Sequence, residues 1–180
     1  MSDQGLIKRR GGLGSVILVP DAQMHFTHSA TSLAEWLRYP TEIWRETQRT
    51  GEVATDRDLA TLLKCEVGER WFRISSIRRG SGKIKPLAWT EIYKLPKSAE
   101  VAARADHGRT LVHQQIARMF GEAIEHAELD IFVSRIPHKF FERLEAEPES
   151  PALIVVRRRF GARNGLSEIT VTTHPEGRYT

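Results

Sequence analysis

Apolar and polar residues alternate along two pairs of segments, as they do in antiparallel strands. Residues 71–79 (WFRISSIRR) and 86–95 (PLAWTEIYKL) predict one hairpin, because strand side chains on one face repeat every two residues. Residues 152–160 and 167–173 predict a second hairpin, since the Asn-Gly pair between them favours a tight turn. Residues 127–135 (AELDIFVSR) predict one further strand.

Helical spacing of apolar residues appears between these strands. Asp56 can cap a short helix with leucines on one face, and Thr110 stands at the N-cap of a second helix over 108–119. A third helix is predicted over 138–147, with its phenylalanines and Leu144 inward. Helices that interrupt antiparallel hairpins indicate an α+β fold, an antiparallel sheet with flanking helices.

The first twenty residues predict a separate hairpin. The glycine-rich segment 11–14 forms a turn between two short strands, and Arg9 and Arg10 stand at its tip. Residues 21–55 start polar and then carry aromatic side chains, which predicts a linker followed by a helical or irregular docking segment. A lone hairpin is marginally stable in water, so this one should pack on the rest of the chain or belong to a larger unit.

Composition limits the class of protein. The 180 residues are 40% hydrophobic and 28% charged, which suits one globular domain with some extra chain at an end. The net charge of +4 fits contact with nucleic acid or with anionic ligands. A single cysteine, Cys65, excludes an internal disulfide, and no apolar run approaches the roughly 20 residues that span a membrane. Without a signal peptide, we expect a cytoplasmic protein with no membrane partner.

Arg78 is the leading candidate for binding an anion. It shares a strand face with Ile74 and Ser76, and its guanidinium fork can hold a carboxylate or phosphate through two hydrogen bonds. Thr110 adds a helix N-terminus, whose free N–H groups also favour an anion. Two plainer alternatives stay open: Arg78 as a solvent-facing hairpin charge, and Thr110 as a simple helix cap.

Glu91 and Glu168 stand at matching places in the two predicted hairpins. A pair of carboxylates can act as general acid and base, but no nucleophile accompanies them, and solvated strand carboxylates are the plain alternative. The seven histidines lack metal-ligand spacing, and neither a Gly-x-Ser-x-Gly elbow nor a phosphate loop occurs. We therefore expect no catalytic residues, no metal and no cofactor.

A series of short motifs follows a fixed order over residues 56–180. They are Leu59-Ala60-x-x-Leu63, Gly68, Pro86, Glu91, Tyr93, Leu95-Pro96, Thr110-Leu111-Val112, Pro151-Ala152-Leu153, Arg157, Gly165, Glu168 and Gly177-Arg178-Tyr179. Their order resembles the UTRA domain, the ligand-binding half of the HutC subfamily of GntR-type regulators. The resemblance implies a chorismate-lyase-like (UTRA) fold, a homodimer and a pocket for a small-molecule effector.

The resemblance also implies which residues contact the effector. Ser76 stands where the family often has the first of two arginines, which argues against a strongly charged ligand such as a sugar phosphate. The expected contacts are Ser76, Arg78, Glu91, Thr110, Glu168, Thr170, Thr172 and Tyr179.

The segment RRGGLGSVI near the start of the chain resembles the wing and last strand of a GntR winged helix. We expect a wing remnant over 1–20, a linker and docking segment over 21–55, and the ligand-binding domain over 56–180. If this segment is the wing, we expect the recognition helix to be absent from these residues, so operator DNA should bind only when a complete winged-helix domain is present. The DNA contacts of the remnant would be Arg9, Arg10, Gly12 and Gly14.

Taken together, the patterns and the resemblance favour the effector-binding and dimerisation domain of a bacterial transcription repressor that senses a small anionic metabolite. One alternative is a chorismate-lyase-like enzyme, whose pocket also binds an anion between arginines and a glutamate. Fold similarity alone does not carry activity, however. The other alternative is a dimerisation module with a closed pocket.

Overall fold

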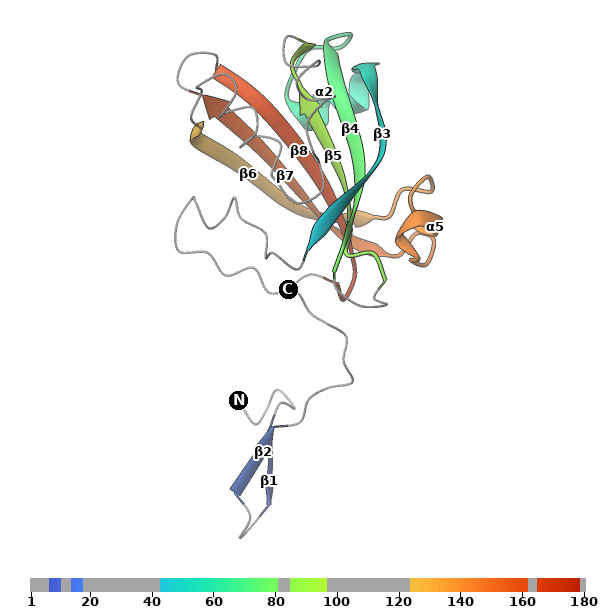
Figure 1. Cartoon of the computed structure of the whole chain (residues 1–180), viewed down its shortest axis with the longest axis vertical. Helices are drawn as coiled ribbons and strands as arrows, with labels where there is room; N and C mark the ends of the chain where they lie inside the picture. The colour runs from blue at the N-terminus through green and yellow to red at the C-terminus, as the bar shows by residue number, and fades with distance from the viewer. Residues whose placement is uncertain are drawn as a thin grey trace.

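The computed structural model describes residues 7–10, 14–17, 43–80, 85–96, 124–161 and 165–178. Within these ranges, six strands form one antiparallel sheet in the order β3-β4-β5-β8-β7-β6, accompanied by two short helices (Figure 1). The α+β class is thereby confirmed. The elements of this sheet are β3 (Trp44–Ala54), α2 (Arg57–Leu63), β4 (Arg70–Arg79), β5 (Ala88–Lys94), β6 (Ile124–Arg135), α5 (Phe141–Leu144), β7 (Pro151–Gly161) and β8 (Gly165–Pro175).

The same sequence of elements occurs twice along the chain. A strand, a helix and a hairpin make up β3-α2-β4-β5, and the order repeats in β6-α5-β7-β8. Both predicted hairpins are present, as β4–β5 and β7–β8. The two halves meet in the middle of the sheet, where β5 pairs antiparallel with β8.

The two faces of the sheet differ in chemistry. One face, here called the helix face, packs Trp71, Trp89 and Val156 against Leu63 of α2 and Leu144 of α5. Strand side chains alternate between faces, so the intervening residues form the opposite face. We call this opposite side the polar face, because most of its buried side chains in the four central strands are hydroxyl or charged groups.

Local signals explain the helix boundaries. Asp56 caps α2 as predicted, because its Oδ1 accepts a hydrogen bond of 2.8 Å from the backbone N of Leu59. The third predicted helix, over 138–147, is shorter than expected: α5 has 4 residues. It ends at Glu145, whose left-handed backbone (φ 49°) stops the helix after one turn.

Strand β3 was not predicted. The helical or irregular segment expected near Trp44 is instead an 11-residue edge strand, so the end of the range 21–55 belongs to the sheet. Its sequence, WRETQRTGEVA, is mostly polar and lacks the alternation that marks a half-buried strand. Backbone pairing with β4 holds it in place, with a register shift between Thr47 and Arg49.

The predicted N-terminal hairpin is also present. Strand β1 (Ile7–Arg10) pairs antiparallel with β2 (Gly14–Ile17), and Arg10 lies opposite Gly14. Its identity as a wing stays a prediction. The predicted helix over 108–119 lies outside the described residues, as do Gly12 and Tyr179. No helix in the described ranges is long and apolar enough to cross a membrane.

Candidate functional site

A row of hydroxyl groups crosses the middle of the polar face. Ser76 of β4 lies opposite Thr90 of β5, which lies opposite Thr172 of β8. The Thr90 and Thr172 hydroxyls are 3.4 Å apart, and Arg78 Nε donates a 3.2 Å hydrogen bond to Thr90 Oγ1. All four side chains are buried. The middle of the polar face therefore carries a row of buried hydroxyl groups, and the Arg78 guanidinium is hydrogen-bonded to one of them.

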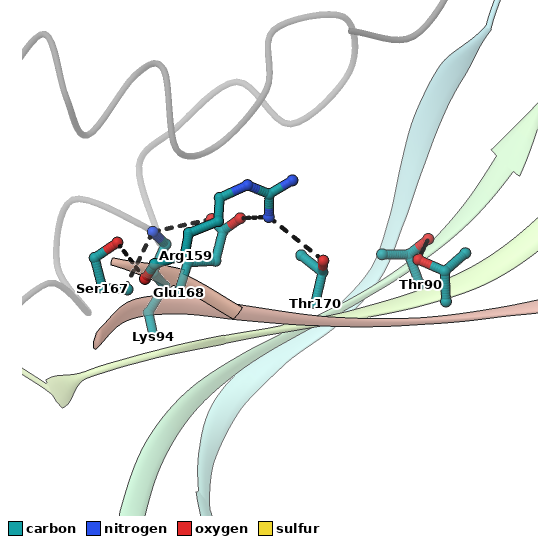
Figure 2. Close-up of polar contacts among 7 residues, drawn as sticks. Thr90, Lys94, Arg159, Ser167, Glu168 and Thr170 are labelled. Atoms are coloured by element: carbon teal, nitrogen blue, oxygen red, sulfur yellow. Dashed lines mark hydrogen bonds and ion pairs between the residues drawn. The ribbon is translucent and has the colours of Figure 1, made fainter. Parts of the chain in front are cut away.

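A buried ion-pair cluster lies beside this row. Lys94 Nζ is 2.9 Å from Glu168 Oε2, and Arg159 Nη1 donates to Glu168 Oε1 (Figure 2). Figure 2 also shows Thr170 next to the cluster, where it accepts a 3.4 Å hydrogen bond from Arg159 Nη1. Lys94 and Glu168 are almost fully buried. One carboxylate thus holds two cations at the edge of the hydroxyl row.

Arg157 is the least satisfied charge of the polar face. It lies opposite Thr170 in the β7–β8 register and is only 5% exposed. Its Nε and Nη2 atoms are buried and have no hydrogen-bond partner among the described residues. Burying a charged group without a partner costs several kcal/mol, about 3–5 when a buried pair is broken. A bound anion would supply the missing acceptors.

The buried charges of this face have a cationic excess. In the described part of the polar face, Glu168 is the one buried carboxylate. The buried cations there are Arg45, Arg78, Lys94, Arg157 and Arg159. Such a surface favours an anion over a neutral or cationic ligand.

The structure brings together five of the eight residues expected at the effector site: Ser76, Arg78, Glu168, Thr170 and Thr172. They share the polar face because the register places Ser76 opposite Thr90 and Thr90 opposite Thr172, and side chains two residues apart on a strand point to the same side. The positions of Thr110 and Tyr179 lie outside the described residues.

Glu91 is not part of this group. It pairs with Ser75 in register and lies on the helix face, whereas Glu168 pairs with Arg159 on the polar face. The two glutamates therefore do not occupy matching positions. Thr90, the residue before Glu91, faces the hydroxyl row instead.

Sequence reasoning missed several residues of the polar face. It expected the run Arg157–Arg159 to alternate between faces, and Arg158 does turn to the helix face, where it donates to the Leu62 and Leu63 carbonyls. The remaining two arginines both point to the polar face. Strand alternation indicates that Arg157 and Arg159 share a face. Placing them beside Thr170, and Thr90 beside Ser76, also requires the register between strands.

Metal ligation is not apparent in these elements. No group of three or more His, Cys, Asp or Glu side chains within the described ranges could hold a metal ion.

Several solved structures of effector or ligand-binding domains resemble this fold. The PhnF C-terminal domain superimposes with a TM-score of 0.70 at 21% identity, over 90% of this chain and 97% of that one. The effector domain of PhnF from Mycobacterium smegmatis gives 0.63 at 16% identity, over 77% and 83%. A ligand-binding domain from Bordetella bronchiseptica, described as that of a GntR-family transcriptional regulator, gives 0.60 at 13% identity, over 76% and 84%. The search of curated proteins found no match.

The fold is therefore that of the effector domains of GntR-family transcriptional regulators. The sequence matches the UTRA domain over residues 46–180, and the chain belongs to that family. The match begins within β3, which agrees with this strand being part of the domain.

Removing the charge of Glu168 should destabilise the domain strongly, because this carboxylate pairs with two buried cations. Glu168→Gln keeps the shape of the side chain but leaves Lys94 and Arg159 buried around a neutral group. We expect a loss of about 3–5 kcal/mol in the free energy of unfolding, measured by urea denaturation. Glu52→Gln is the matched control, because Glu52 pairs with Arg70 at the exposed surface and should change stability by at most about 1 kcal/mol. Equal losses in the two variants would contradict the cluster's role.

Proposed function

We propose that the polar face binds a small anionic effector, and that Arg157 is its main charged contact. The buried and unsatisfied Nε and Nη2 atoms of Arg157 carry this proposal. Two nitrogens on one edge of a guanidinium match the two oxygens of a carboxylate or phosphate. A ligand that supplied those oxygens would offset the cost of burying the charge.

The surrounding groups suit the rest of such a ligand. The hydroxyls of Thr170 and Thr172 can donate to further ligand oxygens, and Glu168 can accept from a ligand hydroxyl or amine. Arg78, held by Thr90, adds positive charge from the other half of the domain. Ser76 replaces an expected arginine, but Arg157 and Arg159 provide two from β7. Thr110 and Tyr179 are proposed as further contacts.

Binding rather than catalysis is the function we propose for this site. Glu168 is held in two ion pairs, so it is poorly suited to exchange a proton as a general acid. The chorismate-lyase-like alternative makes a direct test possible. We expect no product when the full chain is incubated with chorismate, and any turnover that Glu168→Gln abolishes would favour the enzyme.

The wider function that we propose is that of a cytoplasmic repressor of the HutC subfamily. Effector binding would shift the population between two arrangements of a homodimer and so change operator binding. Operator contact would require a complete winged-helix domain, of which the hairpin β1–β2 would be the wing. Arg9, Arg10, Gly12 and Gly14 are its proposed DNA contacts.

Strand β6 offers the surface for that dimer. It pairs only with β7 among the described strands, and Ile131 and Val133 are 52% and 74% exposed. A long edge strand with exposed apolar side chains is a template for pairing with another strand. Antiparallel pairing of two β6 strands about Asp130 would place Glu125 of one copy opposite Arg135 of the other, which matches their charges.

Arg157→Met should separate stability from binding. The variant removes an unsatisfied buried charge but keeps an apolar stem, so we expect the ligand-free protein to be as stable or more stable, by about 1 kcal/mol. Effector binding should weaken by tenfold or more, since a charge-assisted hydrogen bond contributes about 1.5–3 kcal/mol. A thermal-shift panel of anionic metabolites identifies the effector first; a ligand at 100 times its Kd adds about 2.7 kcal/mol.

Arg158→Met is the matched control for this experiment. Arg158 is the next residue on the same strand but faces the helices, where it bonds Asp130 and the end of α2. This variant should lose stability and keep effector affinity. A binding loss in Arg158→Met as large as in Arg157→Met, or no metabolite that shifts the melting temperature, would count against the proposal.

The dimer surface has its own test. Ile131→Glu places a charge in the middle of the β6 edge, so we expect a monomer by light scattering where the unchanged chain is a dimer. Val67→Glu is the control, because Val67 is 66% exposed but lies outside β6. A dimer that survives Ile131→Glu would show that the copies pair elsewhere.

A further inference from the structure

A cavity opens on the opposite side of the sheet from the hydroxyl row. It lies between β3, β4, β5 and the segment that carries Lys139, Phe140 and Arg143, and its volume is about 370 Å³. Pockets that hold small molecules have volumes of about 300–1,000 Å³. We call it the helix-face cavity.

The lining of the helix-face cavity is strongly cationic. Arg49 of β3, Arg73 of β4, and Lys139 and Arg143 from the α5 region line it together with one carboxylate, that of Glu91. Within the described ranges, none of these four cations is within ion-pair distance of a carboxylate. The four converge on one space from three parts of the chain. Arg49, Lys139 and Arg143 are exposed and Arg73 is half-buried, so the cavity concentrates positive charge at its rim.

Glu91 does not neutralise this charge by direct pairing. Its oxygens accept hydrogen bonds from the Ser75 hydroxyl at 3.2 Å, the Trp89 indole at 3.4 Å and the Tyr93 hydroxyl at 2.6 Å. Burial, reinforced by the Glu91 charge, raises the pKa of Tyr93 well above its usual range, so Tyr93 remains a neutral donor. Protein donors thus occupy Glu91. Arg143 Nη1 donates a 3.0 Å hydrogen bond to Gln48 Oε1, which is neutral, so the positive charge of the four cations remains for a ligand to neutralise.

The inner wall of the cavity is aromatic. Trp89 and Phe140 stack with ring centroids 4.6 Å apart, and both are buried. Lys139 Nζ lies 4.8 Å from the Phe140 ring, and the Arg143 guanidinium lies 5.8 Å from the Trp89 ring. These cation–π contacts hold two of the cations against the rings. A cationic rim over an aromatic wall suits a molecule with both a carbon framework and several negative charges.

We propose that the helix-face cavity is a second ligand site, for a small polyanion that carries phosphate or at least two carboxylate groups. It is separate from the proposed effector site, because the sheet lies between them and Glu91 and Thr90 point to opposite faces. Nothing in this proposal depends on what the polar face binds.

Calorimetric titration of the full chain with citrate and with inorganic pyrophosphate tests the proposal. The two probes separate carboxylate from phosphate preference. We expect at least one to bind with a stoichiometry of one per chain, and to lose tenfold or more in affinity in Arg49→Gln and in Arg73→Gln. Arg49 is exposed on an edge strand, so its variant should fold normally. Glu91→Gln removes the single carboxylate of the lining and should tighten binding.

Two control variants identify where the probes bind. Arg70→Gln removes the same charge from an exposed position of β4 outside the cavity and should leave affinity unchanged. Arg157→Met should also leave it unchanged. No binding of either probe at millimolar concentration overturns the proposal, as does an equal loss in Arg70→Gln. Loss in Arg157→Met alone would assign the anions to the polar face, which overturns the second site and keeps the proposed effector site.

Discussion

The pairing of β5 with β8 fixes which side chains meet in the middle of this domain. Thr90 lies opposite Thr172 and Lys94 opposite Glu168, so the two halves of the duplicated chain build one surface between them. A shift of one residue in this register would send every side chain to the other face. Trp89 and Ile169 would then leave the core, which is why the packing of the helix face enforces the arrangement of the polar face.

Stability and binding compete on the polar face. A sheet of this size could bury an apolar face there, yet the central strands place Lys94, Arg159 and Glu168 in the interior. Buried ion pairs contribute little net stability, and apolar replacements of similar volume are often as stable or more stable. Arg157, with two unsatisfied nitrogens, is a further cost. Such costs in stability are characteristic of functional sites, where a ligand supplies the missing hydrogen-bond partners.

Strand alternation made much of this fold predictable. The two hairpins, the capped helix at Asp56 and the shared face of Ser76 and Arg78 follow from residues that are neighbours in sequence. Strand β3 could not be predicted in the same way, because its polar edge is held by backbone pairing to β4. Glu91 was misplaced because it was matched to Glu168 by position within a hairpin. The face of each glutamate depends on the register, which is a property of the folded sheet.

We propose that an anion accepts hydrogen bonds from the buried and unpartnered Nε and Nη2 atoms of Arg157. A crystal structure grown with sulfate tests it most directly. We expect density for the anion on the polar face, within a hydrogen-bond distance of about 2.7–3.0 Å from Arg157 Nε and Nη2. Protein acceptors already bonded to both nitrogens, with no anion at that place, would contradict it.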